Sequence, residues 1–146
     1  ATDKAIEFYE KAIEENPHDK HAYANLGSTL LYKKPKQAKE YLQKALNIDP
    51  EHDIALIELG KIDKSEGNTV AAQVKFRKAY DLYLKQWKTN SLPKYAYGWF
   101  ATVAEELGEN NFAKEIRASA PKTESEAYYN KENLSMTKTK ALTNNN

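Results

Sequence analysis

The sequence contains no cysteine, and this absence excludes disulfide bonds and metal sites built from thiolates. It also lacks any apolar run close to the roughly 18 residues that a membrane-spanning helix needs. An excess of charge is lacking too, because 22 basic and 21 acidic side chains leave a formal net charge of +1. Such a balance carries no electrostatic signature of nucleic-acid binding. We therefore expect a cytoplasmic protein without membrane or nucleic-acid partners.

Sequence motifs that carry catalysis or cofactor binding are absent as well. There is no glycine-rich phosphate loop, no pair of histidines with metalloprotease spacing and no nucleophile elbow. His18 and His21 stand three residues apart, but two imidazoles without a cysteine or a well-placed carboxylate do not complete a zinc site. We expect no catalytic residues, no metal and no cofactor, and we do not expect an enzyme.

What the chain does contain is a motif that recurs three times. Its spacing is an alanine, four residues on an aromatic residue or leucine, three on a second alanine, and five on a proline. The intervals between copies are 33 and then 34 residues. A fixed period in this range predicts a helical solenoid, which presents surfaces for binding. The copies are Ala5, Tyr9, Ala12, Pro17; then Ala38, Leu42, Ala45, Pro50; then Ala72, Phe76, Ala79, where the proline is missing.

A second half-motif precedes each later copy. It consists of Tyr23, Leu26 and Gly27 in one case, and of Leu56, Leu59, Gly60 and Gly67 in the other. Together the two halves resemble the tetratricopeptide repeat. The resemblance is strong over 3–84 and weaker over 94–120, where Ala101 replaces the helix glycine. It implies two antiparallel helices per repeat, stacked into a right-handed superhelix that binds partners.

The residues of the motif also make physical sense without the family. Alanine and glycine at fixed offsets let two helix backbones approach closely, and Pro17 and Pro50 end one helix and permit the next. Gly67 suits the left-handed conformation at a helix C-terminus. We expect helices near 3–15, 19–32, 35–48, 52–66, 69–88, 94–107 and 110–120.

The predicted architecture is therefore an all-α, right-handed α-solenoid of about seven helices with a polar C-terminal tail. The chain opens inside the second helix of a repeat, so we expect a fragment of a longer protein. Its exposed first helix should either self-associate weakly or fray. The tail is polar, and we expect it to be disordered or to form a short capping helix with Tyr128, Tyr129 and Leu134. The boundaries are 1–121 for the repeat domain, with half repeat 1–17, repeats 18–50 and 51–90 and degenerate repeat 93–121, and 122–146 for the tail.

The resemblance implies that the first helix of each repeat lines a concave groove. The apolar residues at its contact offsets either complete helix packing or form a partner site. Because Leu56, Leu59, Tyr97 and Phe100 already fill the core offsets, we favour an exposed apolar patch with a polar rim. A chaperone-tail carboxylate is not expected, since Glu58 would repel it. The offsets fall on His21, Ala24, Asn25 and Ser28, then on Ile54, Ile57, Glu58 and Lys61, then on Tyr95, Gly98, Trp99 and Thr102.

One departure from the period is an insertion in the third repeat. The interval from Ala72 to Ala113 is 41 residues, seven more than one repeat. Seven residues are close to two helical turns, so the helix that begins near residue 69 grows to about 30 Å. Tyr80, Tyr83 and Trp87 share one face of it. They form either a local aromatic core or a platform of Tyr83 and Trp87 for a partner's aromatic or proline side chain; we expect Tyr83 partly buried and Trp87 nearest solvent.

These observations predict a protein-interaction module that captures a peptide or helix in its groove. The alternative is a regulatory or substrate-docking domain of a larger enzyme whose catalytic part lies outside this chain. A helical-repeat RNA-binding protein is a third interpretation, which the neutral charge disfavours.

Overall fold

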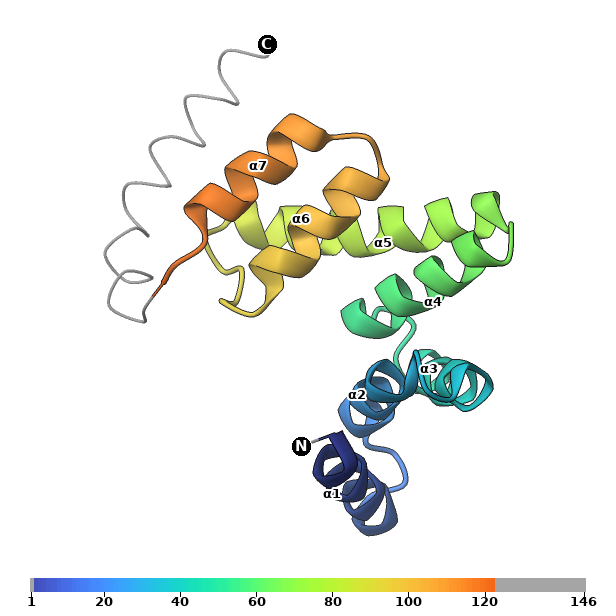
Figure 1. The fold of residues 1–146 in the computed structure, drawn as a ribbon. Helices are drawn as coiled ribbons and strands as arrows, with labels where there is room; N and C mark the ends of the chain where they lie inside the picture. The colour runs from blue at the N-terminus through green and yellow to red at the C-terminus, as the bar shows by residue number, and fades with distance from the viewer. Residues whose placement is uncertain (1, 123–146) are drawn as a thin grey trace. The chain divides into compact units, whose positions relative to one another are not determined.

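The computed structural model describes residues 2–122, and all regular structure in this range is helical (Figure 1). Every expected helix is present, with its bounds within two residues of the expected ones. Except for Lys122, the predicted tail lies outside the described residues, and so does the predicted capping helix. The helices are α1 (Thr2–Glu15), α2 (Lys20–Leu30), α3 (Pro35–Ile48), α4 (Asp53–Ser65), α5 (Thr69–Lys88), α6 (Ala96–Glu106) and α7 (Asn110–Ser119).

The chain divides into two compact units, 1–79 and 80–146. Helices α1 to α4 belong to the first unit and α6 and α7 to the second, while α5 contributes residues to both. The helices fall within the predicted half repeat and repeats, whose boundaries stay a prediction. The all-α fold class with antiparallel helix pairs is confirmed.

Local chemistry explains where the helices begin and end. Asp19 caps α2, because its side chain accepts a hydrogen bond from the backbone N–H of Ala22 at 3.0 Å. Pro35 is the first residue of α3, where its missing N–H costs nothing. Gly67 and Gly108 follow α4 and α6 with φ of 84° and 85°, the left-handed conformation that glycine adopts without steric cost.

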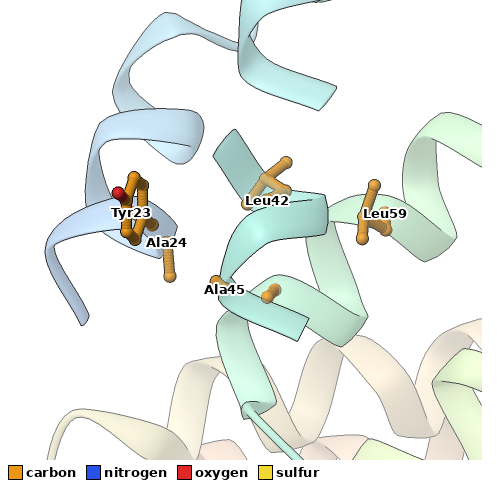
Figure 2. Packing of buried hydrophobic residues seen from close by; sticks show 6 residues of the cluster. Tyr23, Ala24, Leu42, Ala45 and Leu59 are labelled. Atoms are coloured by element: carbon orange, nitrogen blue, oxygen red, sulfur yellow. The ribbon is translucent and has the colours of Figure 1, made fainter. Parts of the chain in front are cut away.

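The core of the first unit lies between α2, α3 and α4 (Figure 2). Small residues make these contacts close, as the motif predicts. A Cβ atom placed on Gly27 would lie 2.6 Å from Cγ of Leu42, and one on Gly60 would lie 2.6 Å from a ring carbon of Phe76. The buried cluster comprises Tyr23, Ala24, Leu42, Ala45, Ala55 and Leu59.

Helix α1 covers a second cluster of the first unit, formed by Leu26, Leu30 and Ala38. It contributes Ile6, Tyr9 and Ile13, which are only partly buried. No residue of α1 is fully buried, and Phe8 is 69% exposed. The outer side of α1 therefore keeps apolar surface in contact with solvent.

Candidate functional site

The predicted contact residues of α2 lie on one side of that helix. His21 is exposed, Asn25 and Ser28 are half-buried, and Ala24 is fully buried against the core. His21, Asn25 and Ser28 follow one another at intervals of four and three residues, so their side chains share one face of α2. This face therefore offers an imidazole, an amide and a hydroxyl, and it is polar.

The corresponding residues of α4 are less exposed than the groove pattern predicts. Ile54 and Lys61 are half-buried, but Ile57 and Glu58 are 0% and 3% exposed. The expectation of a surface position is thus wrong for Ile57 and Glu58, because neighbouring structure encloses this side of α4. Burial raises the pKa of the Glu58 carboxyl, and Nζ of Lys61, 3.4 Å from its Oε1, partly offsets that rise.

A pair of histidines joins the N-terminal ends of α2 and α4. Nδ1 of His21 lies 3.0 Å from Nε2 of His52. Nδ1 of His52 accepts from the N–H of Ala55 at 3.4 Å, so His52 caps α4. That bond assigns the proton of His52 to Nε2, which then donates to His21. Sequence reasoning missed His52 and compared His21 with His18 instead, since nothing local marks a contact between residues 31 positions apart.

The environment of His52 disfavours its charged form. Desolvation lowers the pKa of His52, and the nearby charges of His21 and Lys20 lower it further, while Asp53 and Asp49 act in the opposite direction. Within the described residues no group of three or more histidine, aspartate or glutamate side chains could hold a metal ion. His52, whose neutral form is favoured, therefore caps α4 and contacts His21 at the start of α2.

We expect this cap to make stability depend on pH. Because the pKa of His52 is lowered from 6.5 in the folded chain, its contribution is complete above pH 6.5 and is lost as the pH falls toward the folded value. His52→Asn keeps a capping side chain but cannot titrate. Urea unfolding at about pH 7.5 and about pH 5.5 should show a smaller loss of stability in His52→Asn than in the parent. Equal losses in both proteins would contradict this account.

In the second unit the predicted contact residues lie on α6. Tyr95, at the start of the helix, is 58% exposed, and Trp99 and Thr102 are half-buried. The hydroxyl of Thr102 donates to the carbonyl of Gly98 at 2.9 Å. Gly98 itself is exposed, and a Cβ atom placed on it would meet no atom within 4 Å. This face of α6 thus carries two aromatic side chains, and between them the backbone at Gly98 is exposed because no side chain covers it.

The inserted turns of α5 build an aromatic cluster. The ring of Phe100, which is 0% exposed, lies 5.6 Å from Tyr80, 5.9 Å from Tyr83 and 5.6 Å from Phe112, centroid to centroid. The ring of Trp87 meets that of Phe112 edge to face at 5.2 Å. Such offset and T-shaped pairs add to the stabilisation from burial. The rings of Tyr80, Tyr83, Phe100 and Phe112 therefore form a local aromatic core, which is the first of the two interpretations that the sequence left open.

The exposure of Tyr83 is the second correction. It was expected to be partly buried, but it is 1% exposed, with the ring of Phe100 packed against it, and so it cannot contact a partner. Tyr80, on the same face of α5, is buried as well, at 5% exposure. Trp87 is half-buried, and its role as a platform residue stays a prediction. Sequence reasoning missed Phe112, which occupies no motif position.

Comparison with known proteins agrees with this geometry. A family model described as "Tetratricopeptide repeat" matches residues 2–19 and 21–52, which contain α1 and the α2–α3 pair. No curated protein was found to match the chain. None of the helices in the described range is long and apolar enough to cross a membrane. Over these matched residues, the chain is similar to the tetratricopeptide repeat family.

Proposed function

We propose that the chain is a protein-interaction module that binds a peptide or helix of a partner protein. Repeats of this family generally mediate protein–protein interaction. Each unit offers one contact face at the groove offsets. The face of the first unit is polar and consists of His21, Asn25, Ser28, Ile54 and Lys61; the face of the second, on α6, consists of Tyr95, Gly98, Trp99 and Thr102.

The observation that carries this proposal is Gly98. A glycine in a helix interior costs about 1 kcal/mol relative to alanine. At Gly27 and Gly60 close helix contacts explain that cost, but the space around Gly98 is open and its φ is not positive. A bare backbone beside Tyr95 and Trp99 allows a partner's main chain to approach α6 closely, and the two aromatic side chains then supply contact area.

Gly98→Ala should stabilise the chain by about 0.5–1 kcal/mol, because it removes a flexible residue from a helix without a clash. Gly98→Leu should be tolerated by the fold for the same reason, yet it should block the face. Urea unfolding measures the first effect. For the second, peptides selected from a random display library on the parent chain are titrated against Gly98→Leu by fluorescence anisotropy.

The matched control for this experiment is Ala118→Leu, which adds the same bulk at an exposed position of α7. We expect the selected peptides to bind Ala118→Leu like the parent and to bind Gly98→Leu about tenfold more weakly, the factor that corresponds to about 1.4 kcal/mol. Peptides whose affinity is the same for all three proteins would refute the α6 face as the contact site.

Two further parts of the proposal concern the oligomeric state of the protein and its location in the cell. Weak self-association through α1 is supported by the exposure of Phe8, and sedimentation equilibrium over rising concentration tests it. A monomer at all concentrations would contradict it. The cytoplasmic location stays a prediction from the cysteine-free composition.

A further inference from the structure

The connection between α2 and α3 is built differently from the other turns inside the helix pairs. The α4–α5 and α6–α7 connections contain Gly67 and Gly108 with positive φ. No residue from 31 to 34 has a positive φ, and Pro35 follows directly as the first residue of α3. The N–H of Lys34 still donates to the carbonyl of Leu30 at 2.8 Å, so the chain turns tightly. The side chain of Tyr32 at this corner is 91% exposed.

A cavity of about 480 Å³ opens beside this corner, within the first unit. Its apolar walls are Leu31 and Tyr32 from the connection, Pro35 from the start of α3, and Ile62 from α4. Pockets of 300 to 1,000 Å³ with mostly apolar walls are the usual size for ligand sites. The cavity is open to solvent on one side, and an aromatic or aliphatic side chain can lie against its apolar walls.

The rim of the cavity is positively charged. Lys36 and Lys39 line this cavity. The same two lysines also line a second hollow of about 560 Å³ along α3, together with Lys44 and Glu40. Lys39 forms an ion pair with Glu66 at 3.0 Å, but both side chains are nearly half exposed. Exposed pairs of this kind contribute little to stability, so a carboxylate of a ligand can replace Glu66 at small cost.

We propose that this corner, defined by Leu31, Tyr32, Pro35, Lys36 and Lys39, binds an acidic segment of a partner protein. One aromatic or aliphatic residue of the segment enters the cavity, and carboxylates on either side of it contact the two lysines. A protein segment fits better than a nucleic acid, because the entrance is apolar and the net charge of the chain is only +1. The site shares no residue with the α6 face of the proposed function, and it shares only Lys61 with the face of the first unit.

The probe is a synthetic peptide of one phenylalanine flanked on each side by two glutamates, titrated into the isotope-labelled full chain and followed by amide chemical shifts. We expect the shifts to cluster at 31–39 and 61–66. The double reversal Lys36→Glu with Lys39→Glu should weaken binding about tenfold through lost charge pairing. Tyr32→Ala should weaken it without a change in stability, because the side chain is exposed.

Two controls separate this site from general electrostatic attraction. Lys4→Glu with Lys11→Glu changes the net charge equally on exposed positions of α1 and should leave binding unchanged. A peptide with serine in place of phenylalanine should bind clearly more weakly. The proposal is overturned if the shifts fall elsewhere, if no saturation occurs, if the serine peptide binds equally well, or if a single-stranded oligonucleotide binds more tightly through the same lysines. None of these outcomes bears on the Gly98 experiment.

Discussion

Replacing Phe100 by alanine is expected to destabilise the second unit by about 3–5 kcal/mol, the usual loss for a buried aromatic side chain. Phe100 is 0% exposed and contacts the rings of Tyr80, Tyr83 and Phe112. Its removal would take away three ring contacts together and leave a cavity lined by rings that cannot all collapse into it. Phe112 also makes three ring contacts, but its side chain is only half-buried, whereas Phe100 is fully buried.

Urea unfolding followed by tryptophan fluorescence is the appropriate measurement. Both tryptophans, Trp87 and Trp99, belong to the second unit, so the signal reports on the unit that carries the change. Tyr95→Ala is the matched control, since it removes an aromatic ring from the same end of α6 at 58% exposure. We expect it to change stability by no more than about 0.5 kcal/mol. A loss of less than about 1 kcal/mol for Phe100→Ala would mean that the cluster is loosely packed.

The second large effect is expected at the two glycines that lie against a neighbouring helix. Gly60→Leu forces a side chain into the ring of Phe76, whose nearest carbon lies 2.6 Å from the position of the new Cβ. Gly27→Leu meets Cγ of Leu42 at 2.6 Å and the backbone carbonyl oxygen of Ala38 at 3.0 Å. A backbone oxygen cannot move aside as a side chain can. Both changes should cost about 1–3 kcal/mol or more, because overpacking pushes the helices apart.

Circular dichroism during urea unfolding measures this loss across the first unit. Gly98→Leu is the internal control, since it places the same side chain on a helical glycine with open space around it. The three substitutions are chemically identical, so helix propensity cannot explain a difference between them. If Gly27→Leu and Gly60→Leu proved as stable as the parent, the close approach of α2 to α3 and of α4 to α5 would be disproved.

The exposure of individual residues followed the repeat pattern only in part. The offsets of the family place Ile57 and Glu58 on a face that a partner could reach, and the inserted turns suggested the same for Tyr83, yet all three are buried. Periodicity identifies the face of a helix on which a residue lies, but not what covers that face. That depends on the neighbouring helix, whose side chains come from distant parts of the sequence.

The contacts between residues far apart in the chain could not be predicted from the sequence either. His52 lies 31 residues from its partner His21, and Phe112 lies 25 residues from Trp87, with no motif position to mark either one. The cavity at the α2–α3 corner could not be predicted from the sequence for the same reason. Pro35 was recognised as the start of α3, but a hollow requires the walls from α4 as well.

The sequence by itself determined the features that depend on neighbours within a few residues. The bounds of the seven described helices follow from the repeated motif, the prolines and the glycines at turns, because capping and backbone conformation are local properties. The close helix contacts at Gly27 and Gly60 followed as well, since only small residues recur there. Tertiary structure alone decided which aromatic rings are enclosed, which histidines meet and where a cavity opens. Those features depend on side chains brought together from separate helices, and their burial is a property of the packed chain.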